Sequence, residues 1–463
     1  MIAGRRSHWT AVLSRFAEAA GETPVVQASG RLRRVVGLTL EAVGFEAALG
    51  ERCWLRDRHG TNFEAEVVGF SGEVVYLMPT EPVHGLSPSA RVYPDRRILD
   101  VPVGREMLGR VIDGSGNPLD DKGALNPSSR APLMGIAMNP LKREPIREPL
   151  DTGVRAINAI LTVGRGQRLG LFAGSGVGKS TLLGMMTRYT AADVVVVGMI
   201  GERGREVREF IQSSLGSEGL ARSVVVAAPA DRAPLMRMRA AWLATAVAEY
   251  FRDQGLKVLL LMDSLTRFAQ AKREIALAIG EPPATRGYPP SVFASLPALI
   301  ERAGTGVSGG GSITAFYTIL TEGDDMHDPV ADSAKAVLDG HIVLSRRLAE
   351  QAVYPAIDVD TSISRLQDMI TNEEQQALVR RFRQILATWR QNEDLILVGA
   401  YRKGEDPRVD EAVAFYPRIV EFLRQNSTEA FDLQRSLDSL KALFAADDVV
   451  ADDVAADDGR KIA

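Results

Sequence analysis

Short apolar runs separated by glycine and polar turns dominate residues 25–95. These runs are β-prone and show little helical periodicity. Runs of this length and spacing are typical of a small all-β barrel or sandwich, so we expect a β-barrel domain over residues 23–97. The runs expected to form its strands are Val25–Gln27, Arg33–Leu40, Cys53–Arg56, Phe63–Phe70 and Val74–Met78.

A different pattern begins near residue 152, where Val- and Leu-rich runs alternate with helical stretches. The runs lack strict apolar–polar alternation, which is typical of parallel strands covered on both faces. This predicts an α/β core over residues 98–365, in which the turn-rich residues 101–150 form an extended connecting segment. The expected strands are Arg168–Phe172, Val194–Ile200, Ser223–Ala228, Val258–Met262 and Ser312–Leu320, and the helices include Ser180–Tyr189, Arg205–Leu215 and Ala233–Gln254.

The two ends of the chain carry further patterns. Helical periodicity over Glu373–Trp389, Asp410–Gln425 and Ser427–Phe444 predicts a C-terminal helical domain at residues 366–445. Residues 446–463 contain pairs of aspartates among Ala and Val and are expected to form a disordered acidic tail. Trp9, Val12, Leu13 and Phe16 fall at helical spacing within residues 1–22, where a helix could pack on its own domain or dock a partner.

Composition narrows the class of protein. The 463 residues are 45% hydrophobic and 25% charged, which is typical of a soluble globular chain with two or three domains. A net charge of −4 argues against a general nucleic-acid binder. The single cysteine, Cys53, excludes a disulfide framework within the chain and is expected to be a small buried hydrophobe. No apolar run reaches the roughly 18–20 residues that a bilayer-spanning helix needs.

The strongest chemical signal is Leu169–Thr181, in which an apolar strand runs into a glycine-rich turn and then a helix. This order predicts a phosphate-binding loop, because the glycines let backbone N–H groups face a triphosphate and the helix start adds its dipole. Lys179 would reach the terminal phosphates, and Ser180 would ligate magnesium. Ala173 stands where the usual pattern has glycine. The residues expected to bind the nucleotide here are Ala173, Gly174, Ser175, Gly176, Val177, Gly178, Lys179, Ser180 and Thr181.

A second acidic group is expected for the metal. Asp263 follows the apolar run 259–262, so it stands at the carboxyl end of a strand, where its carboxylate would meet Mg²⁺ opposite Ser180, usually through water. The alternative is an N-cap for the following helix, and both roles could hold.

One glutamate and three arginines are candidates for the hydrolytic step. Glu202 follows the strand 194–199, and from a strand beside the phosphate-binding strand it would reach the attacking water. Arg203 could orient it, while Arg267 and Arg365 could stabilise transition-state charge. Arg365 lies far along the chain, so a neighbouring subunit's site is as plausible a target as its own. From the residues alone, surface salt bridges and ordinary ion pairs remain alternatives for all four.

With these motifs in place, the chain resembles the rotary ATPase family, which comprises the catalytic subunits of ATP synthase and their relatives that drive protein export. It is most similar to the flagellar type III export ATPases. The order of barrel, nucleotide domain and helical domain matches the whole chain except the tail, and the Ala173 form of the loop also occurs in that branch. The matching segments are Phe172–Thr181, Gly201–Glu206, Leu260–Phe268, Gly280–Pro290, Gly309–Asp325 and Asp339–Arg347.

The resemblance implies roles for individual residues. ATP and Mg²⁺ would be the substrate and cofactor, with Lys179 on the β- and γ-phosphates and Mg²⁺ held by Ser180 and Asp263. Glu202 would polarise the attacking water, and Arg203 and Arg267 would lie near the γ-phosphate.

The resemblance also implies roles for Arg365 and for two aromatic residues. Arg365 matches an arginine finger given in trans to the next subunit of a homohexameric ring. Tyr354 matches an aromatic that stacks on adenine, and Phe422 would form the opposite wall.

The family likeness also implies partners and a location. A stator-like regulator would bind the N-terminal helix, and a coiled-coil stalk protein would enter the ring pore near Glu322–Asp328. The export gate, chaperones and exported proteins would be further partners, and no nucleic acid would bind. The chain would be cytoplasmic and peripheral to the inner membrane, at its cytoplasmic face. The alternatives are a virulence-type III secretion ATPase, a non-catalytic nucleotide-binding ring subunit, which typically lacks the carboxylate at Glu202, and an RNA translocase on a related ring.

Overall fold

The computed structural model describes residues 12–13, 29–95, 100–307, 309–320 and 328–445. Its contacts divide the chain into two compact units, residues 1–99 and 100–463, and each is described by itself. The expected docking helix at 1–22 lies outside the described residues apart from Val12 and Leu13, as does the acidic tail at 446–463. In the described part, no helix combines the length and the apolar character that crossing a membrane requires.

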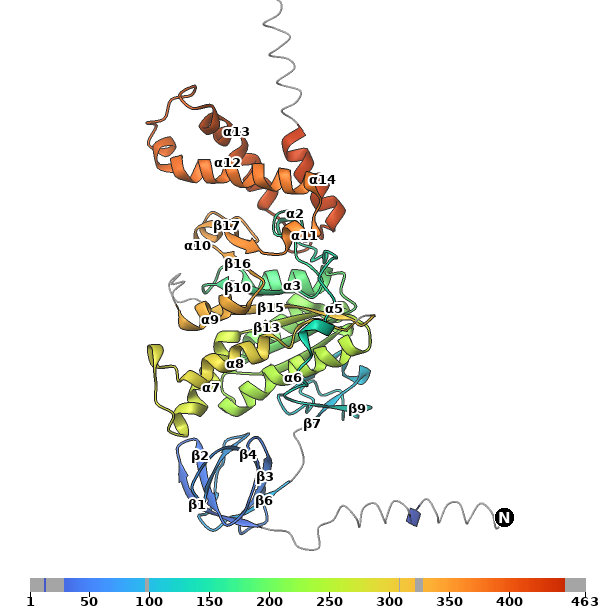
Figure 1. The fold of residues 1–463 in the computed structure, drawn as a ribbon, viewed down its shortest axis with the longest axis vertical. Helices are drawn as coiled ribbons and strands as arrows, with labels where there is room; N and C mark the ends of the chain where they lie inside the picture. The colour runs from blue at the N-terminus through green and yellow to red at the C-terminus, as the bar shows by residue number, and fades with distance from the viewer. Residues whose placement is uncertain (1–11, 14–28, 96–99, 308, 321–327, 446–463) are drawn as a thin grey trace, which may run out of the picture. The chain divides into compact units, whose positions relative to one another are not determined.

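The first unit is a closed β-barrel, as the sequence predicts (Figure 1). Its strand order is β1-β2-β5-β4-β3-β6, and antiparallel pairing of β1 with β6 closes the ring. Alternate side chains such as Leu32, Leu40 and Leu55 are fully buried inside it. Closure leaves no sheet edge exposed. The strands are β1 (Gly30–Val36), β2 (Thr39–Val43), β3 (Arg52–Arg56), β4 (Asn62–Ser71), β5 (Val74–Pro79) and β6 (Arg91–Pro94).

Two details of the barrel differ from the sequence prediction. The run Arg33–Leu40 is not one strand, because Gly37 adopts φ 55° and turns the chain between β1 and β2. The short strand β6 was not predicted, and the expected run Val25–Gln27 lies outside the described residues. Cys53 is buried as expected, and burial raises the pKa of its thiol to about 12, so it is an unreactive core residue.

The second unit is built on a central, mainly parallel sheet, for which the order β17-β16-β10-β15-β13-β11-β12-β8 is found (Figure 1). Among the described strands of this sheet, β17 pairs antiparallel with β16 and the short β14 with β15, while the other pairs are parallel. The predicted strands at 194–200, 223–228 and 312–320 have the same bounds in the structure. The strands are β8 (Arg110–Ile112), β10 (Arg168–Ala173), β11 (Val194–Ile200), β12 (Ser223–Ala228), β13 (Lys257–Asp263), β14 (Gly304–Thr305), β15 (Ser312–Leu320), β16 (Gly340–Leu344) and β17 (Ile357–Ser364).

Both faces of this sheet are buried, as the continuous apolar runs predict. Val195, Val197 and Leu259 belong to a core that includes residues of α2, α3 and the C-terminal helices. Their neighbours Val196 and Leu260 are equally buried, and Figure 1 shows α6, α7 and α8 gathered beside β13 and β15. The helices of the core are α2 (Arg155–Ile160), α3 (Lys179–Tyr189), α4 (Gly204–Glu209), α5 (Gly216–Ala221), α6 (Pro234–Asp253), α7 (Leu265–Ala278), α8 (Pro290–Ile300), α9 (Pro329–Val337) and α10 (Arg346–Glu350), with a π-helical turn at Phe210–Leu215 and a 3₁₀ turn at Thr285–Gly287.

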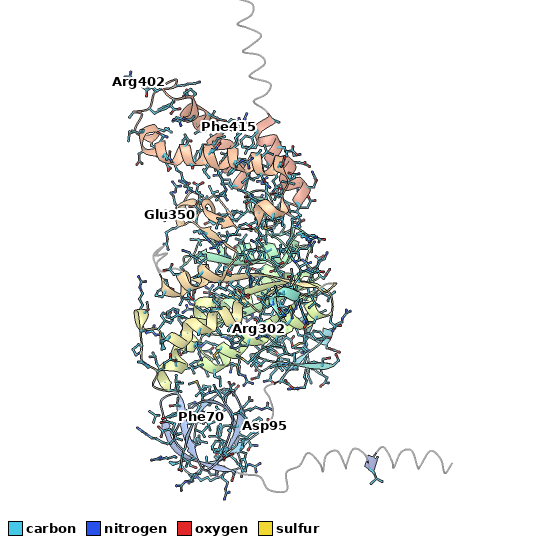
Figure 2. All side chains as sticks on the ribbon, in the orientation of Figure 1. Phe70, Asp95, Arg302, Glu350, Arg402 and Phe415 are labelled. Atoms are coloured by element: carbon cyan, nitrogen blue, oxygen red, sulfur yellow. The ribbon has the colours of Figure 1, made fainter. Side chains whose placement is uncertain are left out.

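The connecting segment 101–150 holds more structure than expected. Strand β8 adds to the edge of the central sheet beside β12, and β7 pairs with β9. Arg302, which Figure 2 labels in the α/β core, donates to the carbonyl of Leu133 at 2.8 Å and so ties the segment down. The elements here are β7 (Asp100–Val103), β9 (Ser129–Pro132) and 3₁₀ turns at Arg105–Met107 and Pro140–Lys142.

The C-terminal region is helical, as predicted, with shifted bounds. The first long helix runs eight residues beyond the predicted end at Trp389, and the last begins only after Asp432, whose side chain accepts from the backbone N–H of Arg435 at 2.7 Å. Phe415, labelled in Figure 2, packs its ring 5.5 Å from that of Phe444 and joins two of these helices. The helices are α11 (Gln367–Ile370), α12 (Glu373–Leu397), α13 (Pro407–Leu423) and α14 (Leu433–Ala445).

Candidate active site

The glycine-rich loop lies between β10 and α3, as the sequence predicts. Gly176 and Gly178 adopt φ of 79° and 89°, a backbone region that favours glycine. Gly178 is the N-cap of α3, and it leaves the first backbone N–H groups without a side-chain cap. Ser180 and Thr181 are exposed in the first turn, while Ala173 is buried at the end of β10. The loop therefore offers free backbone donors and hydroxyl groups to a phosphate chain.

The side chain of Lys179 joins two carboxylates that lie far apart in the sequence. Its Nζ donates to Asp263 Oδ1 at 2.5 Å and to Glu202 Oε1 at 3.3 Å. Burial alone would lower the pKa of this amino group, but the charges of Asp263 and Glu202 outweigh that effect and raise it. Lys179 therefore stays protonated and holds both carboxylates at the loop.

Asp263 ends β13 and is buried beside the loop lysine. It is not the cap of the next helix, since the hydroxyl of Ser264 accepts from the backbone N–H of Arg267 at 3.3 Å and takes that place. The hydroxyl of Thr318 on β15 donates to Asp263 Oδ1 at 2.6 Å. The N-cap interpretation of Asp263 is thus wrong, and its carboxylate faces the loop.

Glu202 reaches the cluster from a more distant strand than expected. The prediction that its strand β11 lies beside β10 is wrong, because β15 and β13 stand between them. Glu202 meets Lys179 because it lies just beyond the carboxyl end of β11, where parallel strands open toward one shared edge. Burial first, and then the charge of Asp263, raise the pKa of Glu202 to about 7, against the opposing effect of Lys179.

The two nearby arginines differ in placement. The aliphatic part of the Arg267 side chain packs on Gly201. A Cβ added to Gly201 would lie 2.9 Å from the Cβ of Arg267. Its guanidinium donates to Gln270 at 2.9 Å, and its buried Nε has no hydrogen-bond partner among the described residues. Arg203 is instead mostly exposed and pairs with Glu206 at 3.4 Å. Arg267 thus lies directly behind the Gly201–Glu202 turn, whereas Arg203 faces solvent.

Tyr354 lies against the loop, whereas Arg365 does not join the Lys179 cluster. A Cβ on Gly178 would lie 3.4 Å from two ring carbons of Tyr354, which is 43% exposed. Arg365 is exposed just after β17 and donates to the carbonyl of Lys335 at 3.4 Å. Tyr354 is therefore placed to cover a ligand of the loop, and the guanidinium of Arg365 is available to solvent.

Phe422 is more buried than a ligand-facing wall requires. It is 6% exposed, and it packs its ring 5.7 Å from that of Phe382 with the guanidinium of Arg155 at 5.2 Å. Its helix still reaches the site, since the N–H of Gln425, three residues on, donates to the carbonyl of Tyr354 at 2.8 Å.

Sequence reasoning missed residues that support the site from behind. Thr318 was only part of a predicted strand, and Arg155 and Gln425 lay in no recognised motif. Their contacts join positions tens to hundreds of residues apart, such as Arg155 N–H to Gln425 Oε1 at 2.8 Å. A single sequence holds no signal for such pairs beyond their polar character inside apolar stretches.

Two segments of the chain match known protein families. Residues 153–364 match the nucleotide-binding domain of the ATP synthase alpha/beta family, and residues 371–442 match the C-terminal domain of the type III secretion ATPase EscN. The first match contains the whole Lys179 cluster, and the second contains helices α12 and α13.

Similar proteins cover nearly the full length of the chain. A flagellum-specific ATP synthase of Pseudomonas aeruginosa is 60% identical over 425 residues, which is 91% of this chain and 94% of that protein. One of Salmonella typhimurium is 56% identical over 450 residues, covering 95% and 99%. A type 3 secretion system ATPase of Xanthomonas euvesicatoria is 50% identical over 415 residues, covering 89% and 93%.

Solved structures agree with these matches. The assembled ATPase EscN from the type III secretion system of enteropathogenic E. coli is 41% identical, with a TM-score of 0.85 over 90% of this chain and all of that one. The same ATPase in complex with its central stalk EscO has a TM-score of 0.82 at 40% identity, again over 90% of this chain and all of that one. The chain therefore belongs to the ATP synthase alpha/beta family, in its branch of flagellum-specific and type III secretion ATPases, and is a nucleotide-binding ATPase.

Proposed function

We propose that this chain hydrolyses ATP with Mg²⁺ to energise protein export by a flagellar type III secretion apparatus. The observation that carries the chemistry is the meeting of Lys179, Asp263 and Glu202 at the glycine-rich loop. Phosphoryl transfer depends chiefly on positioning and on charge stabilisation. Lys179 at the start of α3, Asp263 at the end of β13 and Glu202 just after β11 can supply both. In this proposal residues 98–365 carry the catalytic site, and 23–97 and 366–445 are the flanking domains.

The residues present fit a magnesium ion. The described part of the chain holds no group of three or more His, Cys, Asp or Glu that would cage a metal. Mg²⁺ prefers one or two protein oxygens, with phosphate and water filling its other positions, and Asp263 with Ser180 can supply those oxygens. Bound there, the ion would neutralise charge on the β- and γ-phosphates.

Lys179 has two sets of partners in this scheme. In the structure its amino group donates to Asp263 and Glu202. With ATP in the loop, its amino group would turn to the terminal phosphates and release both carboxylates, Asp263 for the metal and Glu202 for the attacking water. The raised pKa of Glu202 suits a general base working near neutral pH. Arg267, packed behind Gly201, and Arg203 would steady the developing charge.

The remaining site residues favour a shared site in a ring. Arg365 is exposed and free of the Lys179 cluster, as an arginine finger for a neighbouring subunit would be. Tyr354 would stack on adenine above the loop, and buried Phe422 would support that wall from the helical region. The assembled state named for EscN supports a homohexamer of this chain.

Partners and location follow from the same relatives. The complex of EscN with its central stalk EscO supports a coiled-coil stalk in the ring pore. We place that contact near the loop 322–328, which lies outside the described residues apart from Asp328. A stator-like regulator would bind the N-terminal helix, and the export gate, chaperones and exported proteins would meet the ring at the cytoplasmic face of the inner membrane. No role for nucleic acid is proposed.

The flagellar role is favoured over a virulence-type one by similarity. Identity is 60% and 56% to two flagellum-specific relatives and 50% to the type 3 secretion ATPase of Xanthomonas. Expression of this chain in a Pseudomonas aeruginosa strain that lacks its flagellum-specific ATPase should restore motility. If it restores type III effector secretion in a secretion-ATPase mutant but no motility, the flagellar assignment is wrong.

The catalytic assignment is tested by Glu202→Gln. The amide keeps the size of the side chain but cannot take a proton, so turnover should fall by about 10²–10⁴-fold while binding of a fluorescent ATP analogue is retained. Glu209→Gln is the matched control, because this exposed residue of α4 pairs with Arg205 at the surface, and the variant should hydrolyse ATP normally. Unchanged turnover in Glu202→Gln would remove Glu202 from the mechanism, and a wild-type chain that binds but never hydrolyses ATP would point to a non-catalytic ring subunit.

A further inference from the structure

A fully buried hydroxyl lies directly behind the carboxylate assigned to the metal. Thr318 belongs to β15, the strand between β10 and β13, and is 0% exposed. Its Oγ1 donates to Asp263 Oδ1 at 2.6 Å, while the carbonyl oxygen of Met262 lies at 3.3 Å. A hydroxyl has one proton to give, and a short bond to a charged acceptor is the stronger of the two. The proton of Thr318 is therefore committed to Asp263.

Asp263 Oδ1 carries a second donor, Lys179 Nζ, at 2.5 Å. The proposed function requires Lys179 to leave Asp263 for the phosphates when ATP binds. Thr318 is then the remaining donor to that oxygen among the described residues. Without it the carboxylate could rotate about its side-chain bonds, since no other hydrogen bond among the described residues would then hold it.

We propose that Thr318 is a positioning residue, whose hydrogen bond orients Asp263 so that the carboxylate can receive Mg²⁺ once Lys179 has moved to the nucleotide. This inference rests on the proposed function of Asp263. Groups that orient a ligand commonly change metal affinity about 10–100-fold when removed. Thr318 thus sets the Mg²⁺ concentration at which the metal tightens nucleotide binding, and it contributes little to binding of the metal-free nucleotide.

The test is Thr318→Val, which keeps the branched shape in a buried strand and removes only the donor. Binding of fluorescent ADP is titrated in EDTA and then against increasing MgCl₂. Affinity in EDTA should stay within about twofold of wild type, and the Mg²⁺ concentration that gives half of the tightening should rise about 10–100-fold. Thr318→Ser restores the hydroxyl and should return the Mg²⁺ requirement to near its wild-type value.

Thr314→Val is the matched control. This threonine lies on the same strand, is also buried, and its hydroxyl accepts from the N–H of Gly166 at 2.8 Å, away from Asp263. The control should lower the melting temperature without changing the Mg²⁺ requirement.

Two outcomes overturn the role of Thr318. One is a wild-type Mg²⁺ requirement in Thr318→Val, and the other is an equal loss of affinity with and without Mg²⁺, which would indicate only structural damage. Asp263→Asn separates this from the proposed function. If Asp263→Asn also keeps the wild-type Mg²⁺ requirement, then Asp263 itself does not serve the metal.

Discussion

At the scale of single residues, two carboxylates that contact the same lysine have different hydrogen-bond partners. Asp263 accepts from Lys179 at 2.5 Å and from Thr318, whereas the contact of Glu202 with Lys179 is longer, at 3.3 Å. Burial and the charge of Asp263 raise the pKa of Glu202 to about 7, against the opposing effect of Lys179. A carboxyl group with a pKa near neutrality can exchange a proton at physiological pH, as a general base must.

The raised pKa of Glu202 predicts that ATP hydrolysis depends on pH near neutrality. A base must be deprotonated to act, and the pKa of Glu202 lies at about 7 instead of 4.5. The value of kcat/KM for ATP, which reports groups of the free enzyme, should therefore fall as pH decreases through about 7, approaching tenfold per pH unit below it. Steady-state rates from pH 5.5 to 8.5 at saturating Mg²⁺ measure this limb.

Glu206 provides a control for the acid limb of the kcat/KM profile. A hydrogen bond with Glu206 contributes to the raised pKa of Glu202. In Glu206→Gln the amide can donate to the ionised carboxylate, which favours the charged form, so the acid limb should move to lower pH. A wild-type kcat/KM that stays level from pH 8.5 down to pH 5.5, or an acid limb that Glu206→Gln leaves in place, would contradict the assignment of Glu202 as the titrating base.

The site residues that carry a local motif could be predicted from the sequence. Lys179, Asp263 and Glu202 each follow an apolar strand, and parallel strands bring their carboxyl ends to one edge. The order of the strands could not be predicted from the sequence. The strand before Glu202, β11, was expected next to β10 but lies three positions away from it. Thr318 could not be found because its role depends on a partner 55 residues distant.

At the scale of elements, prediction succeeded where burial alone decides the pattern. Strands β11, β12 and β15 are buried on both faces, so each is one continuous apolar run with visible ends. It failed where a strand is short or tertiary contacts set the end, as at the three-residue edge strand β8 and at α12, which extends eight residues past its predicted end. Residues 424–432, predicted largely as helix, instead form the non-helical junction between α13 and α14.

Arg155 holds this junction together. Its guanidinium donates to the carbonyl of Phe422 at 2.7 Å and of Glu421 at 3.2 Å, and also contacts the carbonyl of Arg424. It lies 4.3 Å from the ring centre of Phe431 as well. These carbonyls end α13 and have no partner within the helix, so one side chain closes the helix and links it to α2.

Replacement of Arg155 should therefore weaken the helical region and, through it, the site. Arg155→Ala leaves those carbonyls unpaired and should cost about 1–3 kcal/mol, seen as a lower midpoint in urea unfolding followed by near-UV circular dichroism. Because Gln425 ties the end of α13 to the Tyr354 carbonyl, affinity for fluorescent ADP should fall as well.

Arg424→Ala is the comparison for this prediction. Arg424 lies in the same turn, and its side chain forms an exposed pair with Glu421 at 3.7 Å, so its loss should cost less than about 0.5 kcal/mol. Equal midpoints for the two variants would show that Arg155 does not secure the junction.

At the scale of the whole molecule, the cluster at the loop is incomplete as a phosphoryl-transfer site. Arg267 provides one partly buried cation behind Gly201, while Arg203 is directed to solvent and Arg365 lies beyond β17. Cations placed against the transferring phosphate contribute most to such reactions. A second copy of the chain that brings Arg365 to this loop would complete the site, which agrees with the assembled relatives.

A shared site makes activity depend on mixing. An Arg365→Ala subunit keeps an intact phosphate-binding loop but cannot supply an arginine finger to its neighbour. A Lys179→Ala subunit has a defective phosphate-binding loop but can still supply Arg365. Each alone should be nearly inactive. In equal mixtures, random head-to-tail rings place a Lys179→Ala subunit beside half of the intact loops, so activity should return to about a quarter of the wild-type value. ATPase rate per chain should also rise with protein concentration as rings form, with mass measured alongside by light scattering. Mixed rings of the right mass that remain inactive would show that Arg365 serves its own subunit or none.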